Sequence, residues 1–305
     1  RPAADRIKFE HIPSRRAQLY GLGEIPAAQA VAPIIRIGSV QYNPTINGAS
    51  PDQRGEYFIL VNPNRTAIDC SDWVISGGIS HTLPAGTVIP ARGRLYVARE
   101  AVGFRARSIS PKADEKRYLV SGYDGQLSAR GETIILSDNA GNTIDSATYP
   151  GSPTPGQEFL RVSEILYAPA APTAEELAGI ATLSASDFEF VELTNIGPSP
   201  LDISGARFVE GISFTFPAAT ILNPGDHILV VANLSAFNLR HPGGLNIAGQ
   251  YTGKLNNDGE QLQILDAVGE NILEFTYNDA WYDPTDDDGY SLVLLDPATT
   301  PVTDY

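Results

Sequence analysis

The feature that most constrains the fold is an internal duplication. Residues 56–62 read EYFILVN and residues 189–195 read EFVELTN, a spacing of 133. The same spacing relates identical residues further along the chain: Asp69/Asp202, Ser71/Ser204, Gly78/Gly211, Pro84/Pro217, Val97/Val230, Phe104/Phe237 and Arg107/Arg240. After a five-residue length change, a spacing of 128 relates Gly131/Gly259, Glu132/Glu260, Asp138/Asp266, Gly141/Gly269, Ile144/Ile272 and Tyr149/Tyr277. Matches this regular indicate a tandem duplication of one domain.

Each copy reads as a series of short strands separated by turns. Apolar residues crowd the two matching segments, which is typical of strands inside a sheet, and Asn62 and Asn195 end them. The chain contains 28 Gly and 23 Pro, and residues 138–142 and 266–270 are predicted to be hairpin loops. Helical periodicity is almost absent. The pattern therefore predicts an all-β fold of two tandem immunoglobulin-like β-sandwiches.

The duplication also divides the chain. We predict an N-terminal extension and linker at residues 1–33, a first sandwich at 34–149 and a second at 159–297, with a linker at 150–158 between them and a tail at 298–305. Within the extension, residues 14–20 are predicted to form a short helix, and residues 22–33 an extended linker. Because the junction is short and rich in Pro, we expect limited bending between the sandwiches.

Composition argues against several classes of function. With 36 acidic and 21 basic residues the net charge is −15, which disfavours nucleic acid because such binding depends on neutralising phosphates. The sequence contains no run of 18 apolar residues, so it predicts no membrane span. The single cysteine, Cys70, has no disulfide partner in the chain and is predicted to fill space. The chain has no Met and no visible signal peptide, so we expect a processed product or a fragment of a longer protein.

No residue pattern predicts catalysis. The four histidines, His11, His81, His227 and His241, lack metal-binding spacing, and the sequence has no HExxH, CxxC, GxSxG or phosphate-loop motif. The repeated pairs Gly131-Glu132 and Gly259-Glu260 are the best acidic feature, and a turn followed by a strand explains them. We therefore predict a non-enzymatic protein with no catalytic residues and no cofactor.

One acidic loop suggests a ligand. Asp283, Asp286 and Asp288 lie in a Gly-containing stretch of repeat two, and carboxylate oxygens in such a loop suit calcium. The spacing differs from that of an EF-hand, and a solvated acidic loop is the competing interpretation. Tyrosines offer a second ligand class: Tyr42, Tyr123, Tyr251 and Tyr282 are candidates to line a carbohydrate-binding face, although a tyrosine on a sandwich strand more often lies half in the core and half at the surface.

The two copies differ at one edge. Repeat two continues into a closing strand at residues 290–295, whereas repeat one runs directly into the next opening strand. An uncovered edge strand invites pairing with another segment. We predict that residues 1–33, residues 150–158 or another chain complete this edge by strand addition, so that a homo-oligomer is one possible outcome.

Four stretches together resemble the lamin tail domain family: EFVELTN, the turn DISG at 202–205, FPAATILNPGDHILVVAN at 216–233 and DGYSLVLLDP at 288–297. Repeat one resembles it through EYFILVN, the turn at 69–73, LPAGTVIPARGRLYVA at 83–98 and GETIILSD at 131–138. Repeat one departs from the pattern by lacking the closing strand. The linker IPAAQAVAP is similar to the passage that joins CotH-like kinase regions to lamin tail domains in large secreted bacterial proteins.

The resemblance implies an immunoglobulin-like sandwich without chemistry of its own. It also implies an extracellular, cell-surface or periplasmic location. We expect a structural or interaction module of an exported bacterial protein that mediates protein–protein contacts or assembly. The alternative is a calcium- or carbohydrate-binding accessory module of an exported enzyme.

Overall fold

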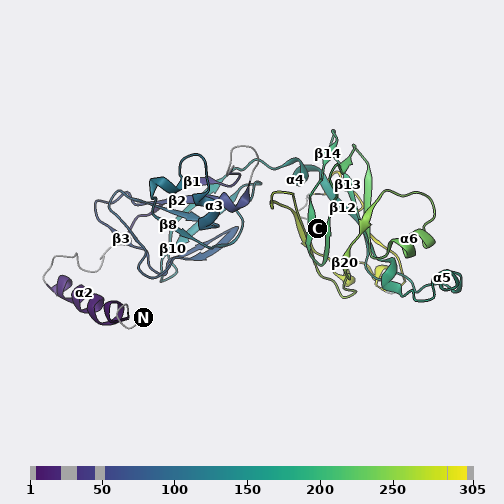
Figure 1. Ribbon diagram of the computed structural model, residues 1–305, viewed down its shortest axis with the longest axis horizontal. Coiled ribbons are helices and arrows are strands. Elements are labelled where there is room, and N and C mark those ends of the chain that lie inside the picture. Colours follow the sequence, from purple (N-terminus) through teal and green to yellow (C-terminus); the bar gives the residue numbers. More distant parts are fainter. Residues whose placement is uncertain (1–4, 22–32, 45–51, 287, 301–305) are drawn as a thin grey trace.

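The computed structural model describes residues 5–21, 33–44, 52–286 and 288–300. Two β-sandwiches follow one another along the chain and lie end to end along the long axis of the molecule (Figure 1). In the described part of the chain, no helix is long and apolar enough to cross a membrane. The all-β prediction and the duplication are both confirmed.

Repeat one packs a four-stranded sheet against a five-stranded sheet. The first has the order β1-β2-β7-β8: Arg36–Gln41, Tyr57–Val61, Arg94–Ala98 and Leu119–Ser121. The second has the order β11-β10-β4-β5-β9: Thr143–Tyr149, Glu132–Ser137, Val74–Ser76, Ile79–Thr82 and Asp124–Gly125. A two-stranded ribbon joins β3 (Ile68–Asp69) to β6 (Val88–Ile89).

Repeat two has the same plan with one strand more. Its first sheet has the order β19-β18-β13-β12-β23: Ile247–Gln250, His227–Val231, Phe190–Asn195, Leu160–Leu166 and Leu292–Val293. Its second sheet has the order β20-β16-β15-β21-β22: Thr252–Gly253, Ile212–Thr215, Arg207–Glu210, Gln261–Leu265 and Asn271–Thr276. β14 (Leu201–Asp202) pairs with β17 (Ile221–Leu222). In both repeats one strand pair is parallel, β7 with β8 and β18 with β19.

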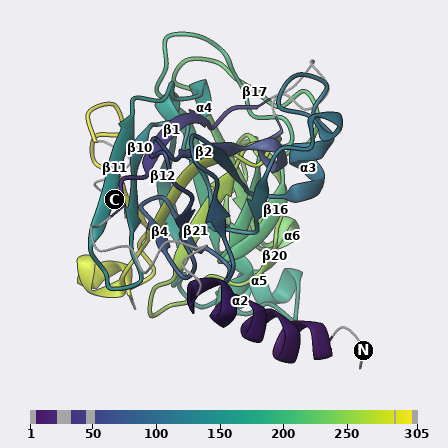
Figure 2. The same ribbon diagram turned by 90° about the vertical axis from the view of Figure 1, so that its left-hand side faces the viewer.

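The helical segments are short. They are η1 (Ile7–His11), α2 (Ile12–Gly21), η2 (Gln53–Gly55), α3 (Ala101–Arg105), η3 (Ala113–Glu115), α4 (Pro155–Phe159), α5 (Ala174–Gly179), η4 (Ala185–Phe188), α6 (Leu234–Arg240), η5 (Asp279–Trp281) and η6 (Asp283–Thr285). α2 confirms the helix predicted in the N-terminal extension and lies outside both sandwiches (Figure 2). The linker expected after it falls mainly on residues 22–32, which lie outside the described residues.

The duplicated segments form the central strands, as predicted. β2 lies between β1 and β7, and β13 lies between β12 and β18. The asparagine that ends each strand is fully buried. The Asn62 side chain donates to three carbonyls at 2.9 Å and that of Asn195 donates to two at 2.9 Å. These bonds hold the strand exit to neighbouring loops, because buried carbonyls need donors.

The junction between the repeats is partly helical. Thr154 and Gln157 form a reciprocal capping box at the start of α4, which satisfies backbone groups that a helix start otherwise leaves unpaired. α4 leads directly into β12. Segment 150–158 therefore connects the sandwiches without pairing along β1, and one of the three proposed ways of completing the edge of repeat one is wrong.

Part of the edge of repeat one is bonded by a side chain from within the same repeat. Asp145 on β11 accepts a hydrogen bond from the Ile37 amide of β1 at 2.7 Å and an ion pair from Arg36 at 2.8 Å. A side chain thus occupies one exposed donor of the edge strand. In repeat two the predicted closing strand is present, since β23 pairs antiparallel with β12.

Candidate functional site

Polar side chains from both repeats meet at one buried carboxylate, Glu270. This residue is the last of the predicted hairpin loop between β21 and β22, and Asp266 shapes the loop by accepting the amides of Val268 and Glu270. At the end of the loop, the Glu270 side chain points away from its own sandwich and contacts repeat one. Only 1% of its surface is exposed.

Four donors surround the Glu270 carboxylate. Three belong to repeat one: Gln53 Nε2 and Gln126 Nε2 donate to Oε2 at 2.8 and 2.7 Å, and the Ala129 amide donates to Oε1 at 2.9 Å. The fourth is Gln157 Nε2 on α4, at 2.7 Å from Oε1. The two oxygens therefore accept four hydrogen bonds, enough to compensate for much of the cost of burying them.

A cation strengthens the same contact. Arg130 of repeat one donates to the carbonyls of Gln157 and Ile272 at 2.9 and 2.7 Å.

Burial is the main influence on the Glu270 carboxyl and raises its pKa to about 7, although the hydrogen bonds from Ala129, Gln157 and Gln126 oppose the shift. The expectation of limited bending thus acquires a structural basis, because the two sandwiches share a buried hydrogen-bond network.

Each central strand also begins with a buried glutamate. Glu56 accepts the Leu127 amide at 3.2 Å, and Glu189 accepts the Leu255 amide at 2.9 Å and the Tyr251 hydroxyl at 3.0 Å. Burial raises the pKa of Glu56 to about 8 and that of Glu189 to about 7. Such shifts are common at active sites, but structural ion-pair networks produce them too.

The two copies differ in what faces the second oxygen of these glutamates. In repeat one, Arg99 Nη1 lies 3.8 Å from Glu56 Oε1. Position 232, which corresponds to Arg99 in repeat two, is Ala232. Glu189 Oε1 is buried and has no hydrogen-bond partner among the described residues.

The repeated Gly-Glu pairs have a structural role. Glu132 Oε1 accepts the Ser128 amide and the Tyr149 hydroxyl, at 3.2 and 2.9 Å. Glu260 makes the corresponding contacts with the Asn256 amide and the Tyr277 hydroxyl. In each repeat the carboxylate fastens a turn to the last strand of the hairpin.

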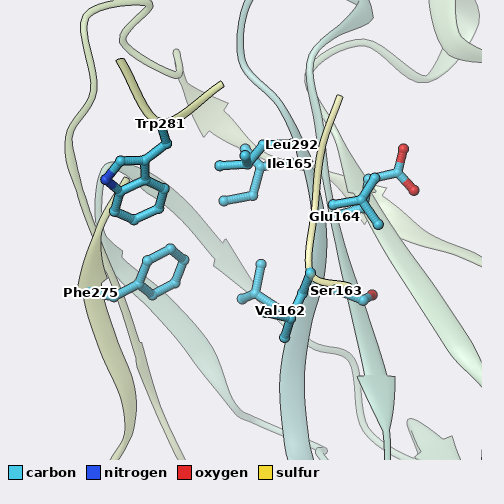
Figure 3. A pocket seen from close by; sticks show the side chains of 9 residues that line it. Val162, Ser163, Glu164, Ile165, Phe275, Trp281 and Leu292 are labelled. Carbon is cyan, nitrogen blue, oxygen red and sulfur yellow. The ribbon is translucent and has the colours of Figure 1, made fainter. Parts of the chain in front are cut away.

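Two pockets open on repeat two. One has a volume of about 240 Å³ and is lined by Tyr167, Pro169, Ser184, Ala185, Ser186, Glu189, Lys254 and Asn257. The other, of about 260 Å³, lies between β12, β22 and β23. In it Trp281 and Phe275 face Val162, Ile165 and Leu292 across an apolar space, while the Glu164 and Ser163 side chains point away (Figure 3).

The structure places the predicted calcium ligands on one tightly turned loop. Asp283 begins η6, Asp286 follows its end, and Asp288 lies beyond. The buried Thr285 between them bonds the Tyr167 hydroxyl at 2.8 Å and so anchors the loop. Within the described residues, no group of three or more His, Cys, Asp or Glu side chains is arranged to hold a metal ion.

The tyrosine hypothesis is largely wrong. Tyr123 and Tyr251 are 5% and 3% exposed and belong to the cores. Tyr42 stacks on Tyr149 at 5.3 Å between ring centroids. Of the four candidates, only Tyr282 is well exposed, so they do not form one carbohydrate-binding face.

The remaining candidates are explained by packing. Cys70 is fully buried, and burial raises the pKa of its thiol to about 12, which keeps it unreactive near neutral pH. His241 packs on the Phe237 ring, with ring centroids 4.7 Å apart. His227 Nδ1 bonds Glu192 at 2.7 Å in an exposed pair.

Sequence reasoning missed Glu270. A signal was present, because the spacing of 128 aligns Glu270 with Asn142, so that the two hairpin loops differ in charge at this position. Nothing local identified its partners, since Gln53 and Ala129 lie 217 and 141 positions away.

Comparison with known proteins places the chain in a family. A search among curated proteins returns no match. Among solved structures, it is similar to a DUF4876 family protein from Bacteroides thetaiotaomicron VPI-5482, at 13% identity and a TM-score of 0.26, over 44% of this chain and 49% of that one. It is also similar to the exo-beta-D-glucosaminidase CsxA, at 10% identity and a TM-score of 0.18, over 78% of this chain and 26% of that one. The chain spans about half the length of the first structure and about a quarter of the second.

The family comparison gives a clearer result than the solved structures. The family model described as Lamin Tail Domain matches residues 28–151 and again residues 153–279. These two matches contain both repeats up to the hairpin of repeat two, and lamin tail domains are non-catalytic, immunoglobulin-like modules. The chain belongs to the lamin tail domain family, and it carries that domain twice in tandem.

Proposed function

We propose that the chain is a non-enzymatic structural or interaction module of an exported or cell-surface bacterial protein, and that it mediates protein–protein contacts or assembly. The observation that supports this most is the buried Glu270 network. It holds two non-catalytic domains in one orientation, which is useful for presenting surfaces at a fixed separation. Preorganisation of this kind lowers the entropic cost of binding a partner.

Direct binding measurements test this function. Labelled chain is titrated onto the envelope and secreted fractions of producing cells, and saturable binding is expected, with heat-unfolded chain as the control. A panel of glycoside, peptide and phosphoester substrates is tested in parallel. Turnover that the purified chain sustains and that Glu189→Gln abolishes would contradict a non-enzymatic role, because Glu189 is the buried carboxyl that faces an open pocket.

Calcium binding is the second candidate function. The observation in its favour is the anchoring of the acidic loop through Thr285, which holds Asp283 and Asp286 at the two ends of one short turn. A divalent cation would relieve the repulsion between these carboxylates. Affinity in the range of about 10⁻⁴ to 10⁻³ M, typical of extracellular modules, would suffice.

Calcium is predicted to raise the melting temperature of the wild-type chain. The physical reason is that an ion bound only by the folded state stabilises it by mass action. The measurement is a thermal melt with calcium and with chelator, on wild type and on an Asp286→Asn/Asp288→Asn variant. An equal shift in both proteins, or none in the wild type, would leave the loop as a solvated turn.

A further inference from the structure

Repeat one contacts repeat two through a hydrogen-bonding site for a carboxylate, here called the socket, and repeat two has a site at the corresponding position. In repeat one the socket is made by the three donors to Glu270, namely Gln53, Gln126 and Ala129. The two spacings of the duplication place Ser186, Lys254 and Asn257 at the corresponding positions of repeat two. All three line its 240 Å³ polar pocket. The pocket is therefore the repeat-two counterpart of the socket that Glu270 fills.

The turn that supplies the backbone donor is the same in both repeats. In repeat one, the Ser128 amide bonds Glu132, the Ala129 amide bonds Glu270, and the Arg130 amide bonds the Ser128 hydroxyl. In repeat two the first and third amides keep their bonds, from Asn256 to Glu260 and from Asp258 to the Asn256 side chain. The middle amide, that of Asn257, has no hydrogen-bond partner in the described part of the chain.

The side chains of the repeat-two socket favour an acidic partner. Lys254 replaces the neutral Gln126 and adds a positive charge to the pocket, where it interacts electrostatically with Glu189. Beside it, Glu189 is 1% exposed, and its Oε1 accepts no hydrogen bond from any described residue. A turn with a carboxylate and a free N–H group would satisfy Lys254, the Asn257 amide and Glu189 Oε1 together, and buried polar groups normally find such partners.

The repeat-two socket lies at the outer end of the molecule. Ser186 belongs to η4, which is held to the start of α6 by a hydrogen bond between Asp187 and Asn233 at 3.0 Å. α6 lies at the end of repeat two that is farther from repeat one (Figure 1). A further domain docked there would continue the head-to-tail order that the two repeats already show.

We propose that the socket formed by Ser186, Lys254 and Asn257 binds the acidic β-hairpin turn of a further lamin tail module, in the way that repeat one binds the turn containing Glu270. This deepens the proposed interaction function by naming the partner, and it rests on that function. A second copy of this chain fits less well, because its free hairpin carries the uncharged Asn142 at the position of Glu270. In a series of domains joined by head-to-tail contacts of this kind, the socket of the last domain stays unfilled.

The chain itself supplies a probe. Asn142→Glu in the full chain puts a carboxylate where repeat two carries Glu270, in a turn that has the same Asp at its start and the same amide contact. Sedimentation velocity over a range of concentrations is expected to show head-to-tail association of this variant, at least tenfold tighter than any association of wild type. Adding Lys254→Glu is expected to reverse it. Asn139→Glu, with the same net charge in the same turn, is the matched control.

The results separate the alternatives. Association of the Asn142→Glu chain that Lys254→Glu abolishes and Asn139→Glu does not reproduce supports the proposal. Equal behaviour of wild type and Asn142→Glu, or association that persists with Lys254→Glu, overturns it. Wild-type association that Lys254→Glu abolishes would assign the socket to a second copy and overturn the need for an acidic turn. Saturable binding to envelope fractions that is insensitive to Lys254→Glu would overturn this socket while leaving the interaction function intact.

Discussion

Replacing Glu270 with alanine is expected to split the thermal unfolding of the chain into two transitions, one for each repeat. The substitution removes the acceptor of four hydrogen bonds and leaves Gln53, Gln126, Gln157 and the Ala129 amide without it. A buried donor that loses its acceptor and is not reached by water costs about 1–3 kcal/mol. We therefore expect the free energy of interaction between the two domains to fall by about 3 kcal/mol or more. Calorimetry measures the split, and small-angle scattering measures the accompanying spread of interdomain distances.

The duplication supplies a matched control for this experiment. Asn142→Ala changes the corresponding position of the repeat-one hairpin, whose side chain is exposed and donates to Asp138 in its own loop. It should change the melting profile by only a few tenths of a kcal/mol through the loss of a local bond to Asp138. If Glu270→Ala and Asn142→Ala melt alike and scatter alike, the Glu270 network does not fix the relative orientation of the repeats.

The free energy of unfolding is expected to fall as the pH rises from about 5 to 8.5. Burial raises the pKa of Glu56 to about 8 and the pKa values of Glu189 and Glu270 to about 7, from an ordinary value of 4.5. Between the ordinary and the raised pKa the folded state holds protons that the unfolded state has released. The stabilisation is therefore fully present below about pH 4.5 and is lost as the pH passes through 7 to 8. Because one pKa unit corresponds to about 1.4 kcal/mol, three such groups should change the stability by several kcal/mol.

Glu56→Gln/Glu189→Gln identifies the groups responsible. A neutral amide cannot ionise, so the variant should lose less stability than wild type between pH 5 and pH 8.5 in chemical denaturation. Glu176→Gln is the control of opposite sign: its hydrogen bonds from Arg240 hold the pKa of Glu176 at about 2, so that its contribution is lost only in acid. Parallel pH profiles of wild type and the double variant would refute the assignment.

The sequence by itself determined the architecture. Runs of apolar residues and turn residues act over a few positions, and they located β2, β13, the hairpin around residues 138–142 and its counterpart at 266–270. Repetition doubled each of these signals, and the family assignment follows from their order.

Only the tertiary structure decided which polar residues meet. Glu270 ends a loop that both repeats share, yet three of its four donors come from the other repeat, 141 to 217 positions earlier. The hydrogen bond from the Ile37 amide of β1 to Asp145 could not be predicted for the same reason, since the two residues are 108 positions apart. Neither pairing leaves a local pattern, because hydrogen bonds between distant segments depend on how whole sheets pack. The duplication gave both repeats the same turn, at residues 128–130 and 256–258, and the fold decided that the turn of repeat one binds Glu270.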